Sequence, residues 1–92
     1  MYTAGSTIIE RDDTDTSVYF VGSGSVNVLN YSLSGRAITY TSLASGDIFG
    51  EMAAIDGSPR AAWVLAASDC TVFQIPGNIF MNLAELNHQF SL

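Results

Sequence analysis

Short runs of alternating apolar and polar residues fill the chain from Thr7 to Pro76. In the run Ser25–Tyr31, Val26 and Val28 are separated by an asparagine, so both side chains fall on one face of a strand. Clusters of Gly, Ser, Asp and Asn, which are typical of turns, separate one run from the next. The pattern predicts an all-β sandwich or barrel whose strands lie near Thr7–Glu10, Ser17–Val21, Ser25–Tyr31, Arg36–Thr41, Asp47–Phe49, Ala62–Ala67 and Thr71–Ile75.

Two segments have helical character instead. Glu51–Ile55 is a short run of mostly good helix formers directly after Gly50, and it predicts about one helical turn. From Asn78 to Leu86 the apolar residues Ile79, Leu83 and Leu86 recur at intervals of four and three, which predicts an amphipathic helix packed against the barrel. Asn78 is a suitable N-cap for that helix.

The length and composition of the chain predict one folded domain over residues 1–92. Hydrophobic residues make up 48% of the 92 residues and charged residues 13%, a balance that excludes a disordered chain. The longest apolar run, Ala61–Ala67, is far shorter than the roughly 20 residues that a membrane span needs. A single cysteine, Cys70, predicts a small buried side chain in a reducing compartment, and with no basic and apolar leader visible we expect a cytoplasmic location.

The charge is strongly acidic, with a net charge of −6 and no lysine. Such a surface repels phosphate backbones and anionic lipids, so we expect no direct nucleic-acid contact and no membrane insertion. Any anionic ligand has to be held by Arg11, Arg36 or Arg60 together with backbone dipoles.

Candidate chemistry is concentrated between Phe49 and Ala62. Gly50 allows close approach of a ligand to the backbone, the short helix after it directs free N–H groups outward, and Arg60 returns after a tight turn. A guanidinium can hold two phosphate oxygens at once, and Glu51 can accept a hydrogen bond from a sugar hydroxyl or steady the guanidinium. The segment predicts a cradle for an anionic ligand.

The same segment resembles a known family. Phe49-Gly50-Glu51-Met52-Ala53, followed by Pro59-Arg60-Ala61-Ala62, is similar to the phosphate-binding cassette of cyclic-nucleotide-binding domains, as in protein kinase A regulatory subunits and bacterial catabolite activator proteins. The resemblance extends from Tyr2 to about Leu86 through the segments Tyr2–Gly5, Val18–Val21 and Ala44–Asp47.

The resemblance implies a jelly-roll β-barrel with short helices and a cyclic nucleotide as its ligand. It implies that Arg60 pairs with the cyclic phosphate and that Glu51 accepts the ribose 2′-hydroxyl. Backbone amides around Gly50, Met52, Ala53, Ala61 and Ala62 would complete the cradle, with the base against Val26 or Val28. Members that prefer cGMP often carry threonine after the arginine, so Ala61 favours cAMP.

The resemblance also carries expectations about the whole protein. The family's N-terminal helices and its long C-terminal hinge helix do not fit in this chain, so we expect a fragment that signals to an effector domain of a parent protein. A homo-oligomer is compatible with this arrangement. Trp63 stands where many members have a small residue, and both a position on the barrel exterior and a contact with the ligand are open.

The sequence bears on three other interpretations. Catalysis is not expected, because nucleophile motifs and phosphate loops of hydrolases are missing and His88, the single histidine, cannot build a metal site. The acidic run Asp12–Asp15 lacks the glycine and distal glutamate of a calcium loop and predicts a solvated turn. The alternative function is a degenerate domain that serves as a protein-interaction module through apolar groups around Trp63 and the C-terminal helix.

Overall fold

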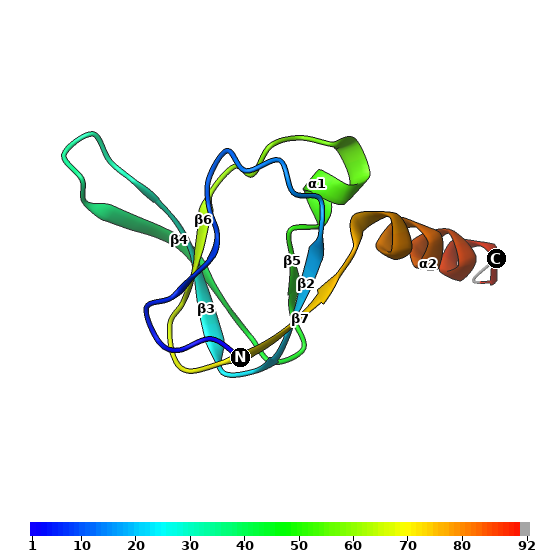
Figure 1. Ribbon diagram of the computed structural model, residues 1–92, viewed down its shortest axis with the longest axis horizontal. Coiled ribbons are helices and arrows are strands. Elements are labelled where there is room, and N and C mark those ends of the chain that lie inside the picture. The colour runs from blue at the N-terminus through cyan, green and yellow to red at the C-terminus, as the bar shows by residue number, and fades with distance from the viewer. Residues whose placement is uncertain (91–92) are drawn as a thin grey trace.

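The computed structural model describes the backbone of residues 1–90 and the side chains of residues 1–86. Within this range the chain forms strands and two helices, in the order β1 (Thr7–Ile9), β2 (Val18–Ser23), β3 (Ser25–Tyr31), β4 (Ala37–Ala44), β5 (Ile48–Phe49), α1 (Glu51–Asp56), β6 (Trp63–Ala66), β7 (Thr71–Ile75) and α2 (Gly77–Phe90) (Figure 1). Each predicted strand is present, and the helix predicted after Gly50 is α1.

The strands form two antiparallel sheets, one with the order β1-β6-β3-β4 and one with the order β5-β2-β7. Both contribute to a common core, in which Val21 and Val26 are fully buried and Tyr19, Phe49 and Val64 pack around them. The mostly β jelly-roll class is therefore confirmed. The described strands stay in two sheets and do not close into a continuous hydrogen-bonded barrel.

The β3–β4 hairpin is longer than the sequence pattern indicated. β4 continues to Ala44, which pairs with Ser25 at the start of β3, because the backbone N–H and C=O groups of β3 offer hydrogen-bonding partners along its whole length. Figure 1 shows the tip of this hairpin projecting away from the two sheets. Consequently Ile38 and Tyr40 of β4 are exposed.

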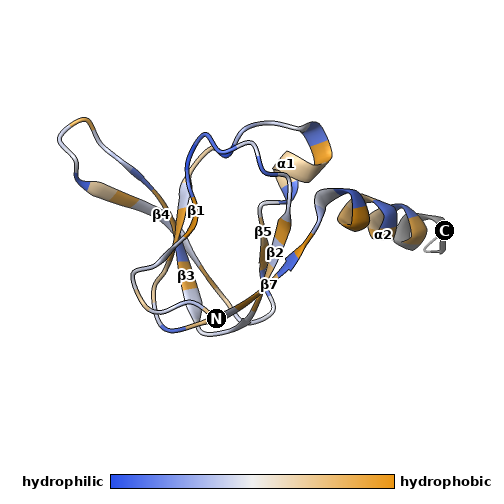
Figure 2. Cartoon of the chain, in the orientation of Figure 1, coloured by the Kyte–Doolittle hydropathy of each residue, from blue (hydrophilic) through white to orange (hydrophobic). Residues whose placement is uncertain are grey.

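The prediction that the last helix packs against the barrel is wrong. Figures 1 and 2 show α2 running outward from the sheets, with its apolar residues in view. Ile79, Leu83 and Leu86 are 44%, 54% and 50% exposed. The helix begins at Gly77, so Asn78 lies inside its first turn and is not the cap.

The direction of α2 is set where β7 ends. A side chain at Gly77 would approach the Thr16 carbonyl oxygen to 2.5 Å, so the backbone there is pressed against the segment that precedes β2. The helix is packed against α1 and not against a sheet face. The spacing of apolar residues identified the apolar face of this helix, but it did not identify the element against which the helix packs. His88 lies outside the residues whose side chains are described.

Cys70 is buried, as the sequence predicts, and its backbone pairs with Tyr2. Trp63, for which the sequence left the barrel exterior and a ligand contact open, meets Tyr31 edge-on, with ring centroids 6.0 Å apart. Among the described residues, no helix has the length and hydropathy that crossing a membrane requires.

Candidate functional site

A cavity of about 440 Å³ opens beside the segment that joins β5 to β6. All of the predicted site residues line it, namely Gly50, Glu51, Met52, Ala53, Arg60, Ala61 and Ala62. The rest of the wall comes from Ile9, Val28, Phe49, Asp56, Ser58, Pro59 and Val64. The cavity joins a polar edge, formed by α1 and the turn after it, to an apolar wall formed by the sheets.

Gly50 shapes the polar edge of this cavity. Its φ of 84° lies in the left-handed region, where a residue with a side chain is strained, and it ends β5 and starts α1. A Cβ atom at this position would lie 2.6 Å from Nη1 of Arg60 and 3.1 Å from the carbonyl oxygen of Ser17. Glycine is therefore required both for the turn and for the close approach of the guanidinium.

Arg60 is the cation of the cavity, and it is only 6% exposed. Its Nη1 donates to the carbonyl oxygen of Gly50 at 2.8 Å, and its Nη2 donates to the carbonyl oxygen of Ser17 at 2.6 Å. The guanidinium lies 5.9 Å from the centre of the Tyr19 ring, within the range of a cation–π contact.

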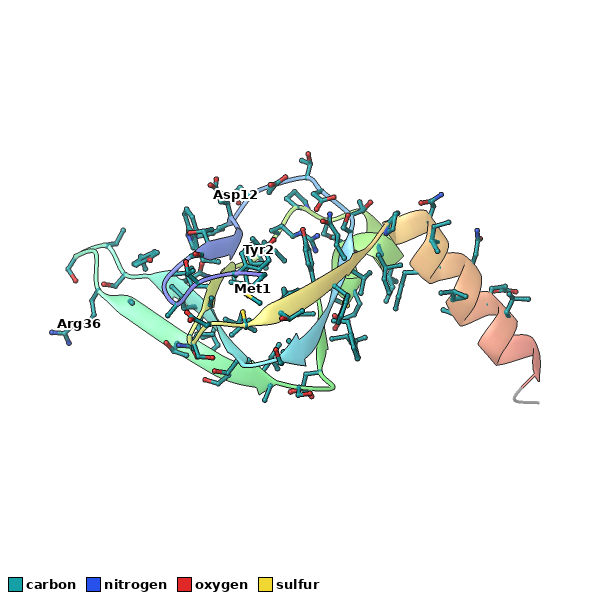
Figure 3. The ribbon with its side chains drawn as sticks, turned by 60° about the horizontal axis from the view of Figure 1, so that its bottom comes forward. Met1, Tyr2, Asp12 and Arg36 are labelled. Carbon is teal, nitrogen blue, oxygen red and sulfur yellow. The ribbon has the colours of Figure 1, made fainter. Side chains whose placement is uncertain are left out.

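The other two arginines lie away from the cavity. Arg11 is exposed and lies 4.0 Å from a carboxylate oxygen of Asp12. Arg36 lies at the tip of the β3–β4 hairpin and points into solvent (Figure 3). Of the three cations that could hold an anionic ligand, the structure places only Arg60 at the cavity.

Two buried polar atoms at the cavity have no hydrogen-bond partner. They are Oε2 of Glu51 and Nε of Arg60, an acceptor and a donor on the two side chains that the sequence assigned to the sugar and the phosphate. Buried polar atoms are almost always paired in native proteins, since leaving one unpaired costs about 1–3 kcal/mol. Both residues line the cavity, so they are candidates to bind a ligand that offers an acceptor and a donor.

The apolar wall contains one of the two valines that are candidates for contact with the base. Val28 lines the cavity, whereas Val26, the other candidate for contact with the base, is fully buried in the core. Both are on β3, but they occupy different levels along it. Trp63 is not among the residues that line the cavity, so the position on the barrel exterior is favoured over a contact with the ligand.

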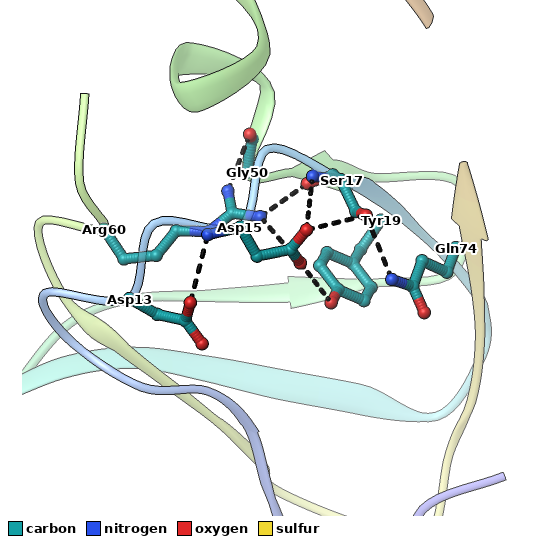
Figure 4. A network of polar contacts seen from close by, with 7 residues as sticks. All are labelled: Asp13, Asp15, Ser17, Tyr19, Gly50, Arg60 and Gln74. Carbon is teal, nitrogen blue, oxygen red and sulfur yellow. Dashed lines mark hydrogen bonds and ion pairs between the residues drawn. The ribbon is translucent and has the colours of Figure 1, made fainter. Parts of the chain in front are cut away.

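The carboxylate that Arg60 meets is Asp15 and not Glu51. Oδ2 of Asp15 lies 3.6 Å from Nη2 of Arg60 (Figure 4). Asp15 belongs to the acidic run that the sequence indicated to be a solvated turn, and 41% of its side chain is exposed. The run is a turn, in which Asp13 accepts from the Asp15 amide at 3.0 Å, but its last member reaches into the site.

A small polar network holds Asp15 in place (Figure 4). Oδ1 accepts from the amide and the hydroxyl of Ser17, at 3.1 and 3.0 Å, and Oδ2 accepts from the Tyr19 hydroxyl at 3.2 Å. Burial opposes ionisation of Asp15, but the hydrogen bonds from Ser17 and Tyr19 and the charge of Arg60 outweigh it and lower the pKa of this carboxyl. The site therefore contains an ionised acid that the sequence pattern did not reveal.

The composition of the site is that of a small-ligand pocket. Among residues 1–86, no cluster of three or more His, Cys, Asp or Glu side chains is placed to hold a metal ion. A jelly roll with an anion-binding cavity in the helical interruption between two strands defines a class of ligand-binding domain.

Comparison with known proteins identifies the family within that class. Residues 1–87 match the family model described as the cyclic nucleotide-binding domain, and the chain belongs to this family. The cAMP-activated global transcriptional regulator CRP of Haemophilus influenzae is 34% identical over 87 residues, covering 94% of this chain and 39% of that protein. The cAMP-dependent protein kinase regulatory subunit of Aspergillus niger is 35% identical over 82 residues, covering 89% of this chain and 19% of that protein.

A solved structure shows the same architecture. The regulatory domain of Toxoplasma gondii protein kinase A, crystallised with cAMP, is 27% identical with a TM-score of 0.82, covering 98% of this chain and 36% of that chain. This chain therefore spans less than half the length of each of these three proteins. The two relatives are, by name, regulatory proteins.

Proposed function

We propose that the cavity beside α1 binds a cyclic nucleotide, with cAMP preferred to cGMP, and that occupancy is signalled to an effector domain outside this chain. One observation supports this above all others. The two residues that the family resemblance assigns to the phosphate and the ribose both line the cavity, and each carries a buried polar atom without a partner, Nε of Arg60 and Oε2 of Glu51.

The electrostatics of the pocket fit this ligand class. A cyclic phosphate diester carries one negative charge, which the guanidinium of Arg60 can match in sign, and Nε–H is the donor of that guanidinium left without a partner. The Glu51 carboxylate is a strong acceptor for a ribose hydroxyl, which has a proton to donate, and a poor neighbour for a phosphate oxygen. The ring system of the base would lie against Val28 and Val64.

The preference for cAMP rests on Ala61, which follows Arg60 and lines the cavity. A threonine hydroxyl at that position could reach a guanine, and the methyl group of alanine offers no such hydrogen bond. The names of the two relatives refer to cAMP, which agrees with this choice.

Calorimetric titration of the 92-residue protein with cAMP and cGMP tests the proposal. We expect saturable binding of both, with cAMP the tighter ligand. Arg60→Lys should weaken cAMP binding by about tenfold or more, because a lysine ammonium has no planar fork that can bond to Gly50 and Ser17 and still direct an Nε–H donor to the phosphate. Arg36→Lys, the same chemical change at the exposed hairpin tip, should leave the affinity unaltered. Absence of heat with either nucleotide at millimolar concentration would refute the proposal.

A second candidate function is a degenerate domain that serves as a protein-interaction module. It is favoured by the existing contacts of Arg60 with Asp15 and two carbonyl groups, and by the exposed apolar residues of α2. The open cavity favours the nucleotide instead, because a degenerate pocket is expected to be filled by the chain's own side chains. The titration above separates the two candidates.

Three wider features of the parent protein are also proposed. The chain would form one domain, residues 1–92, of a larger regulatory protein, and would act in the cytoplasm, where the buried thiol of Cys70 stays reduced. A homo-oligomer remains a prediction, which sedimentation of the intact parent protein can check.

A further inference from the structure

The ion pair between Asp15 and Arg60 is linked to Tyr19 through one hydrogen bond, which the Tyr19 hydroxyl donates to Asp15. Oδ2 of Asp15 lies 3.6 Å from Nη2 of Arg60 and accepts a hydrogen bond from the Tyr19 hydroxyl at 3.2 Å (Figure 4). The other carboxylate oxygen is held by Ser17 through its amide and its hydroxyl. Both oxygens of Asp15 are thus fixed by the residues that begin β2.

The Tyr19 ring is itself fixed. It stacks on Phe49 with centroids 5.2 Å apart and an interplanar angle of 10°, and it is almost completely buried. Phe49 directly precedes Gly50, whose carbonyl oxygen accepts from Nη1 of Arg60. The hydroxyl therefore holds Asp15 from a buried ring that stacks on Phe49, a residue of the cavity wall.

These contacts determine the orientation of the whole guanidinium. A guanidinium is planar and rigid, so fixing Nη1 and Nη2 also fixes the direction of Nε–H. Gly50, Ser17 and Asp15 take the Nη groups, and Nε is the donor left without a partner. Of these acceptors, only Asp15 is charged and only Asp15 is a side chain.

The protonation states needed for this arrangement are present around neutral pH. Burial, together with the neighbouring charge of Asp15 and its hydrogen bond, raises the pKa of Tyr19 to about 12, so the hydroxyl keeps its proton and remains a donor. Asp15, whose pKa is lowered, remains an acceptor.

We propose that Asp15, held by the Tyr19 hydroxyl, is a positioning residue that presents the guanidinium of Arg60 to the phosphate of the bound nucleotide. This inference rests on the proposed function, because it names a further determinant of the same site. It gives a role in affinity to two residues that touch the cavity only through Arg60.

Three single variants test it by calorimetric titration with cAMP. Asp15→Asn keeps the size of the side chain but removes its charge and one acceptor, and it should weaken binding by about tenfold. Tyr19→Phe keeps the stacked ring and removes only the hydroxyl, and it should give a smaller loss in the same direction. Asp12→Asn is the matched control, since it makes the same charge change in the same turn, at a residue with a φ of 71° that asparagine also tolerates, and it should bind as the wild type does.

A double-mutant cycle separates positioning from a merely structural role. If Asp15 acts through Arg60, then Asp15→Asn should cause little further loss of affinity in an Arg60→Lys background. An equal fold-loss in both backgrounds would overturn the proposal, as would wild-type affinity in Asp15→Asn while the wild type itself binds cAMP. Failure of the wild type to bind either nucleotide would refute the proposed function and this inference together.

Discussion

The two glycines that bound α1 offer a matched pair of substitutions. Gly50 and Gly57 have φ values of 84° and 73°, so alanine at either position pays the same left-handed backbone strain, about 1–2 kcal/mol. At Gly57 a Cβ atom would meet nothing within 4 Å, whereas at Gly50 it would lie 2.6 Å from Nη1 of Arg60. The difference between Gly50→Ala and Gly57→Ala therefore isolates the contact with the guanidinium.

The magnitude of that difference follows from the hydrogen bond that is lost. To reach ordinary van der Waals distance the guanidinium has to retreat by roughly 1 Å, which breaks its 2.8 Å bond to the Gly50 carbonyl. A hydrogen bond from a charged donor contributes about 1.5–3 kcal/mol, so Gly50→Ala should lower the free energy of unfolding by about 3–5 kcal/mol and Gly57→Ala by about 1–2 kcal/mol.

Urea unfolding, followed by the fluorescence of the single tryptophan, Trp63, measures both values. Titration with cAMP should show weakened binding for Gly50→Ala, because Arg60 is displaced, and unchanged binding for Gly57→Ala. Equal unfolding free energies and equal affinities for the two variants would refute the argument that Gly50 exists to admit the guanidinium.

Three other predictions concern single groups. The pKa of Asp15 is lowered in the folded state, so its contribution to stability is complete above the ordinary value of 3.8 and is lost as the pH falls through the folded value. The difference in unfolding free energy between wild type and Asp15→Asn, measured in urea, should therefore vanish in acid. The pKa of Tyr19 is raised, so its contribution to stability depends on pH in the opposite direction: it is retained below pH 10.0 and lost as the pH rises towards about 12. Tyr19→Phe should therefore remove a step near 12 from the tyrosinate absorbance titration. Val26→Ala should lower the free energy of unfolding by about 2 kcal/mol without changing the affinity for cAMP, because Val26 is buried in the core. Val28→Ala should weaken cAMP binding, because Val28 lines the cavity. The reverse pattern would show that the base lies deeper than the cavity.

The sequence was a good guide to the elements because strand alternation and turn residues are local signals. The cassette from Phe49 to Ala62 was also local, and all of its predicted site residues line one cavity. Period-two patterning puts Val26 and Val28 on the same face of β3, but it does not show which level of the strand lies under the opening.

The contacts of Arg60 with Ser17 and Asp15 could not be predicted for a different reason. Both partners lie far from Arg60 in the chain, and the hydrogen bond to Ser17 joins residues 43 positions apart, so no local pattern connects them. The single buried cation did require a counter-charge, but the nine carboxylates of the chain gave no means to choose Asp15. Likewise, the amphipathic pattern of α2 does not reveal that its first residue is pressed against Thr16 and that its apolar face is left uncovered.

The wall of the cavity carries two acids, Glu51 and Asp56, for its one guanidinium. A ring-closed diester brings a single negative charge to this wall, where Arg60 is the one cation among the lining residues. An open-chain phosphate monoester brings close to two at neutral pH, and the second charge faces carboxylates without a cation to offset it. We therefore expect the pocket to hold cyclic diesters in preference to linear nucleotide monoesters through this difference in charge.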